Sequence, residues 1–130
     1  MNYGIIETES LKGTSLLDNL DITKTKLILP IESNDNHEWH MNLVEIADPL
    51  LRSTIALIES GLKDEWYAAI FNDQSIYIIF KNKTFQLPIY EMEKSEVYGK
   101  AKSYAISHGI QPIYADFSNN LIEYKTFANL

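Results

Sequence analysis

The chain of 130 residues contains no cysteine and only one arginine, Arg52. Without cysteine it can form no disulfide bond, no cysteine-ligated zinc site and no thiol nucleophile. Arginine is the preferred side chain for recognising phosphate groups and guanine bases, so its scarcity argues against a nucleic-acid-binding protein. The lysines are scattered and form no basic stripe. We therefore predict a cytoplasmic protein that does not bind nucleic acid.

Long apolar runs and glycine-rich phosphate loops are also missing. The longest apolar runs, such as Ile76–Phe80, have about five residues, whereas a membrane span needs about 20. The segment 1–11 contains Glu7 and Glu9 and shows no basic stretch followed by an apolar one, so no signal peptide is predicted. The five glycines are isolated from one another. We predict no cofactor and no contact with a membrane.

Apolar residues are present in sufficient number for a core. They make up 45% of the chain, and 12% of all residues are aromatic, a composition typical of globular proteins. There is no internal repeat, low-complexity tract or linker. We therefore predict a single domain spanning residues 1–130.

The negative charge lies entirely in the first half of the chain. Residues 1–65 hold twelve acidic and five basic residues, which gives the net charge of −7, and residues 66–130 are neutral. The acidic residues are densest between Glu32 and Asp48, where no lysine or arginine occurs. A one-sided acidic field attracts a basic partner or holds a cation. In size, acidity and absence of catalytic motifs, the composition is similar to that of bacterial accessory, inhibitor and immunity proteins.

Several segments have the composition of β-strands. Lys26–Ile31 and Trp39–Ile46 flank a polar turn, Glu32–Glu38, and are predicted to pair as a hairpin. Three further strands, joined by short connections that begin with asparagine, form a predicted meander. These strands are Trp66–Phe71, Ser75–Lys81 and Thr84–Leu87. The middle strand is apolar on both faces, which is typical of a strand covered on both sides. Tyr3–Glu7 is predicted to be a short edge strand.

Two segments have helical start signals and helical spacing. The first helix is predicted to begin at Asp48-Pro49, with Asp48 capping its free amides. The second spans Glu93–Ser107 and ends before Gly109, with His108 near the free carbonyl groups. The last segments, Ile113–Phe117 and Leu121–Phe127, are predicted to form a C-terminal hairpin. The predicted fold class is α+β: a mainly antiparallel sheet with two helices packed on one of its faces.

The segment around the predicted hairpin turn contains the only cluster of residue types that bind metals. His37 and His40 carry imidazole groups, and carboxylates lie nearby, a set that suits zinc, manganese or nickel. On a strand, however, positions 37 and 40 point to opposite faces, and no distant third ligand is recognisable. A metal-dependent hydrolase or nuclease built on these two histidines is therefore the alternative hypothesis.

Our main functional hypothesis is a non-catalytic protein-interaction module whose partner has a basic surface. The candidate contacts are the acidic residues of the turn and two tyrosines expected to be exposed. These residues are Glu32, Asp35, Glu38, Tyr90 and Tyr98. A pocket for a small ligand between a helix and the sheet, as in a sensory domain, is a second alternative. Pairing of two copies through edge strands stays open.

Overall fold

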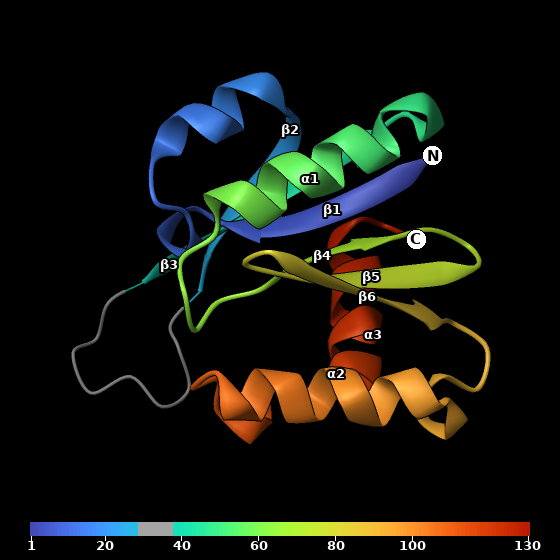
Figure 1. Cartoon of the computed structure of the whole chain (residues 1–130). Coiled ribbons are helices and arrows are strands. Elements are labelled where there is room, and N and C mark those ends of the chain that lie inside the picture. Colours follow the sequence, from blue (N-terminus) through green and yellow to red (C-terminus); the bar gives the residue numbers. More distant parts are fainter. Residues whose placement is uncertain (29–37) are drawn as a thin grey trace.

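The computed structural model describes residues 1–28 and 38–130. Its strands form one six-stranded antiparallel sheet in the order β2-β3-β1-β4-β5-β6, and the predicted α+β class is confirmed (Figure 1). The strands are β1 (Asn2–Glu7), β2 (Asp21–Ile28), β3 (Trp39–Ile46), β4 (Ala68–Phe71), β5 (Ser75–Phe80) and β6 (Lys83–Pro88). The α-helices are α1 (Leu51–Gly61), α2 (Glu96–Ser107) and α3 (Phe117–Phe127). Short 3-10 turns are η1 (Thr8–Ser10), η2 (Thr14–Asn19), η3 (Asp48–Leu50), η4 (Met92–Lys94) and η5 (Pro112–Tyr114).

Strand β1 lies inside the sheet, so the prediction of an edge strand at Tyr3–Glu7 was wrong. It pairs with β3 on one side, with Tyr3 opposite Glu45, and with β4 on the other, with Tyr3 opposite Phe71. Its apolar residues Ile5 and Ile6 are fully buried on opposite faces. A strand that is buried on both faces shows no alternation of apolar and polar residues. In a segment of only six residues, the sequence therefore does not distinguish an inner strand from an edge strand.

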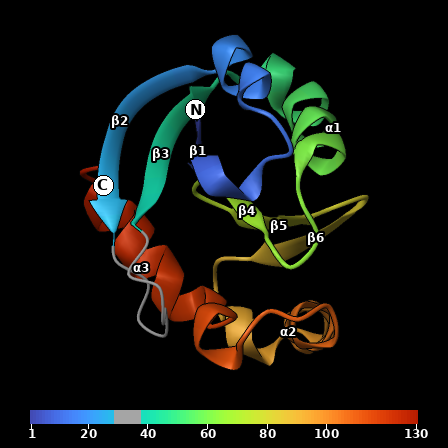
Figure 2. The same cartoon turned by 90° about the vertical axis from the view of Figure 1, so that its left-hand side faces the viewer.

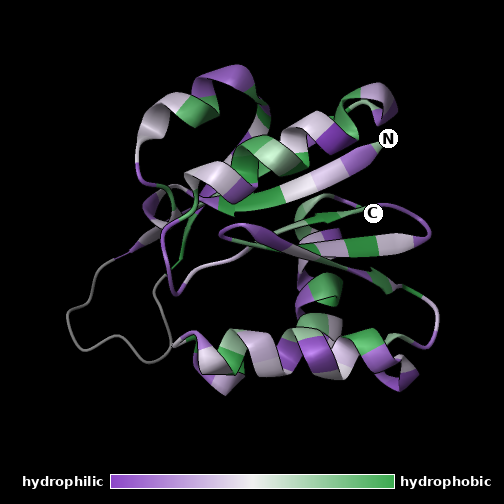
Figure 3. Cartoon of the chain, viewed as in Figure 1, coloured by the Kyte–Doolittle hydropathy of each residue, from purple (hydrophilic) through white to green (hydrophobic). Residues whose placement is uncertain are grey.

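Helices cover both faces of the sheet, whereas the sequence predicted them on one. Helix α1 and η2 pack on one face, and α2 and α3 pack on the other (Figures 1 and 2). We call these the α1 face and the α3 face. Helix α2 lies against β6, while α3 reaches the opposite end of the arched sheet, beside β2 (Figure 2). Hydrophobic residues accordingly concentrate on the inner strands (Figure 3).

Strand β5 confirms the prediction of a strand that is covered on both sides. Ile76, Ile78 and Phe80 are buried on the α3 face. Ile79 is buried and Tyr77 is partly buried on the α1 face. The meander β4-β5-β6 and the antiparallel pairing of β2 with β3 are likewise as predicted.

The first helix begins where predicted but is not capped by Asp48. Residues Asp48–Leu50 form a 3-10 turn that leads into α1, with Ala47 before it and no side-chain cap. The Asp48 carboxylate instead accepts a hydrogen bond of 2.8 Å from the side-chain amide of Asn2. Helix α2 has a conventional cap, because the Ser95 hydroxyl accepts a bond from the Tyr98 amide at 3.2 Å.

The predicted C-terminal hairpin is wrong, because residues 117–127 form helix α3. The Asp116 side chain accepts a hydrogen bond from the Asn119 amide and caps the helix. Phe117, Leu121 and Tyr124 follow at intervals of four and three residues and are buried together on one face. The aromatic and β-branched residues of this segment suit a strand by propensity, but tertiary packing of the buried face decides the structure.

Strand β2 begins at Asp21, five residues before the predicted start at Lys26. Its residues are exposed or half-buried throughout, so the strand lacks the apolar pattern by which strands are recognised. Residues 29–31 of the predicted strand lie outside the described residues.

Gly4 is required for close packing between β1 and its neighbour β3. A Cβ atom at this position would lie 2.6 Å from Cγ2 of Val44 and 3.3 Å from Cδ1 of Ile46. We expect Gly4→Ala to lower the free energy of unfolding by about 1–3 kcal/mol, measured by urea denaturation. Gly13→Ala is the matched control, because no atom lies within 4 Å of its added methyl group. Equal stability of the two variants would contradict this account of Gly4.

Candidate functional site

Of the predicted acidic turn, Glu32–Glu38, the structure describes only the last residue. Glu32, Asp35 and His37 lie outside the described residues. Glu38 is exposed immediately before β3, and His40 lies within β3 with its side chain on the α1 face, opposite Leu27 of β2. Glu38 therefore lies beside the last residues of the edge strand.

His40 forms a double contact with Glu9 of η1. One Glu9 carboxylate oxygen lies 2.6 Å from Nδ1 of His40, and the other accepts a bond of 2.7 Å from the His40 backbone amide. Partial burial acts to raise the pKa of Glu9, but the hydrogen bonds from His40 outweigh it and hold this pKa below its usual value. His40 thus joins η1 to β3. Among residues 1–28 and 38–130, no three histidines or carboxylates are grouped as metal ligands.

The two candidate tyrosines do not belong to one surface. Tyr90 follows β6 and is 82% exposed, as predicted. Tyr98 was predicted to be exposed but is half-buried, with its ring 6.0 Å from that of Phe117 in an edge-on contact. Helix α3, which the sequence did not predict, provides this contact. Tyr90 also lies beyond the sheet edge opposite to β2, so it does not share a surface with Glu38.

Strand β2 is a free edge of the sheet. It pairs with β3 on one side, and among the described residues no strand pairs with its other side (Figure 2). The strand is eight residues long and contains no proline. Ile22 and Leu27 project from it with 38% and 55% of their surface exposed. A bulge at Thr23 shifts the register between Ile22 and Lys24.

Two lysines of β2 contact the last turn of α3. The Lys24 ammonium donates a hydrogen bond of 3.0 Å to the carbonyl oxygen of Phe127. The Lys26 ammonium lies 4.8 Å from the centre of the Phe127 ring, within the range of a cation–π contact. A cation at the C-terminal end of a helix is favoured by the helix dipole. Both lysines are therefore held on the α3 face, beside the free edge.

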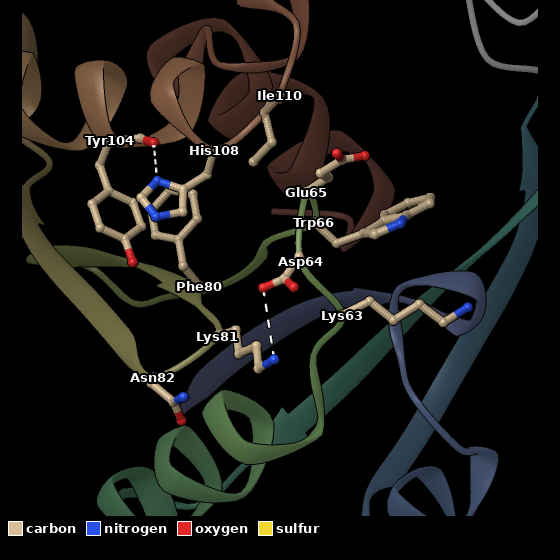
Figure 4. Close-up of a pocket in the computed structure, with 10 residues that line it drawn as sticks. All are labelled: Lys63, Asp64, Glu65, Trp66, Phe80, Lys81, Asn82, Tyr104, His108 and Ile110. Carbon is tan, nitrogen blue, oxygen red and sulfur yellow. Dashed lines mark hydrogen bonds and ion pairs between the residues drawn. The ribbon is translucent and has the colours of Figure 1, made fainter.

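A shallow pocket of about 280 Å³ lies at the end of the sheet between α1 and α2 (Figure 4). Asp64 and Lys81 form an ion pair of 3.7 Å at its wall. His108 stacks on Tyr104 with ring centres 4.0 Å apart, and its Nδ1 lies 2.9 Å from the Tyr104 carbonyl oxygen. Because a carbonyl only accepts, Nδ1 carries a proton, which leaves Nε2 as an acceptor in the neutral ring. This contact confirms the expected capping position of His108.

A buried polar cluster beneath the sheet was not predicted from the sequence. The Tyr67 hydroxyl donates to the carbonyl of Tyr114, and the Asn120 amide donates to both oxygens, at 2.9 and 3.1 Å. Tyr124 lies close enough to Tyr67 for each side chain to affect the pKa of the other. Burial raises the pKa of both tyrosines, and the nearby Glu7 carboxylate adds to the effect. Asn120 and Tyr124 lie in α3, the helix that was not predicted, so nothing in the sequence indicated that they lie near Tyr67.

Glu7 is the unusual acid of this cluster. It follows Ile5 on the α3 face of β1 and is half-buried. Burial raises the pKa of Glu7 to about 7; a backbone hydrogen bond lowers it in part, and the neighbouring Glu9 raises it further. The carboxyl group therefore changes between its protonated and ionised forms near neutral pH.

Comparison of the chain with protein-family models, curated proteins and solved structures gives no match. In the part of the chain that the structure describes, no helix combines the length and apolar character that a membrane crossing requires.

Glu7 makes stability depend on pH. In the unfolded chain its pKa is about 4.5, and in the folded protein about 7, so raising the pH through this interval favours the unfolded state. The loss reaches about 3 kcal/mol above pH 7 and is absent below pH 4. We expect Glu7→Gln to be more stable than the wild type by this amount at pH 8, with no gain at pH 4. Urea denaturation at both values measures it.

The exposed residue Glu38 provides the control for this prediction. Glu38→Gln removes the same charge from an exposed position, so it should give no comparable gain at pH 8. A similar gain from both substitutions would attribute the effect to net charge instead of to the burial of Glu7.

Proposed function

We propose that this chain is a non-catalytic protein-binding module that takes up an extended segment of its partner along the free edge of β2. The exposed outer edge of the eight-residue strand β2, with which no strand of the described residues pairs, carries this proposal. Such an edge presents a row of backbone donors and acceptors to which another chain adds as a further strand.

The two edges of the sheet differ in how they are protected. Helix α2 packs against β6, and the strand carries Lys83 and Pro88 at its ends, features that discourage pairing. Strand β2 has no proline, and its two lysines, Lys24 and Lys26, are held by the last turn of α3. The bulge at Thr23 limits regular pairing to the residues after it. Protection of β2 is therefore partial, which favours a specific partner over indiscriminate association.

The charge of the chain agrees with a protein partner. Asp21 begins β2 and Glu38 lies beside its end, and the first half of the chain carries the whole net charge of −7. This field accelerates the encounter with a partner that has a basic surface. Backbone hydrogen bonds along the residues after the bulge and contacts with the exposed Leu27 then supply the affinity.

A lysine at position 27 should block the docking edge. Leu27 is 55% exposed, so Leu27→Lys leaves the core intact but places a charge where the partner strand would lie. In affinity capture from the native host, we expect at least a tenfold loss of the captured partner. Ile106→Lys is the control, because Ile106 is 44% exposed on α2, away from β2.

Hydrogen exchange of the complex tests the same proposal directly. We expect the amides of β2 to become protected and those of β6 to stay unchanged. Capture that is equal for both lysine variants, or protection elsewhere than β2, would contradict the proposed edge.

A further inference from the structure

We propose that the segment bound by β2 belongs to a different protein and carries acidic residues at two alternate positions, opposite Lys24 and Lys26. This inference rests on the proposed function and specifies the chemistry of the partner. It follows from the arrangement of side chains at the edge, from the contacts of the two lysines and from the repulsion that a second copy would meet.

The register of β2 with β3 places its side chains on defined faces. Lys24 is opposite Leu43 and Lys26 is opposite Met41, both on the α3 face. Thr25 and Leu27 alternate with them and lie on the α1 face. A strand added at the edge continues this pattern, because residues directly opposite each other share a face. The partner therefore places every second side chain beside a lysine of β2.

Pairing with a second copy would bring lysines together. The antiparallel register that uses all five residues after the bulge, Lys24–Ile28, sets Lys26 directly opposite Lys26 of the other copy. A shift by two residues toward the start of the strand sets Lys24 opposite Lys26. Like charges directly opposite each other destabilise a strand pair. The edge is thus unsuited to self-pairing in these registers but suited to a strand with acidic residues there.

The contacts with α3 hold the lysines in place and leave donors available. Of the three N–H donors on the Lys24 ammonium, one is used by the Phe127 carbonyl. The Lys26 ammonium contacts the face of the Phe127 ring. Within residues 1–28 and 38–130, neither lysine forms an ion pair with a carboxylate. Ordering these side chains in the free protein reduces the entropy lost when a carboxylate binds.

The α1 face of the same edge favours apolar side chains. Ile22 and Leu27 are exposed there, and burying them against a partner contributes to affinity. The expected segment therefore alternates acidic with apolar residues. The net charge of −7 acts on the partner as a whole, whereas at physiological salt the paired residues respond to the charges within about 8 Å. A partner that is basic as a whole but has acidic residues in the docking strand is attracted by the net charge and also pairs with the two lysines.

Two blocked nine-residue peptides test the inference, one with alternating Glu and Val in its middle and one with Lys in place of Glu. Binding to the full chain is measured by calorimetry. We expect the Glu peptide to bind about tenfold more tightly than the Lys peptide, since two opposite-charge pairs replace two repulsive ones. The order should reverse for the double variant Lys24→Glu, Lys26→Glu. The matched control is Lys100→Glu, Lys102→Glu on α2, which should keep the wild-type order.

Loss of the contacts with Phe127 is separated from reversal of the charge by Lys24→Gln, Lys26→Gln, which loses the ammonium contacts without introducing negative charge. We expect this variant to bind both peptides alike, and circular dichroism checks its fold. Equal binding of the two peptides by the wild type, binding of neither, or an unchanged order in the Glu variant overturns the inference. A wild-type dimer through β2 at about 100 μM in a sizing experiment also overturns it.

Failure of this inference and failure of the proposed function give different results. If Leu27→Lys abolishes capture of the natural partner but the peptides are not distinguished, the edge is the docking site and the charge inference is wrong. If capture does not depend on Leu27, the proposed function is wrong, whatever the peptides do.

Discussion

The structure depends on the position of β1 between β3 and β4. This strand of six residues joins the pair β2-β3 to the meander β4-β5-β6, and without it the sheet would be two separate parts. Its inner position requires a residue without a side chain at Gly4, where Val44 approaches closely. Because both faces of β1 are covered, the two cores on either side of the sheet also meet at Ile5 and Ile6.

Burial on both faces explains the distribution of polar groups in the molecule. The inner strands carry few charged residues; Glu7 is half-buried on the α3 face, and burial raises its pKa beside Tyr67 and Tyr124. The edge strand β2 is under no such constraint and is rich in polar residues. The two ends of the sheet therefore differ: α2 packs against β6 at one end, and β2 presents backbone groups and two lysines at the other.

Sequence reasoning was most successful where periodicity was strong. The apolar run of β5 and the helical spacing in α1 and α2 were sufficient to predict those elements, because burial of the same apolar residues also determines their structure. It failed at α3, where aromatic residues favoured a strand, and at β2, where an exposed edge needs no apolar pattern. The candidate site was missed because it depends on the contacts of Lys24 and Lys26 with Phe127. This residue ends α3, the helix that was not predicted, and lies about a hundred residues away along the chain.

The pairing of β1 has a consequence for the order in which the chain folds. Tyr3 pairs with Glu45 and with Phe71, so β1 is synthesised before both of its neighbours, and its two sides are occupied only after residue 71 has been made. Loop closure over such separations is slow, and fold completion is correspondingly late. Until then Ile5 and Ile6 stay accessible to chaperones and to other unfolded chains. The strand that joins the two parts of the sheet is therefore open to association with other chains while its later neighbour β4 is still being made.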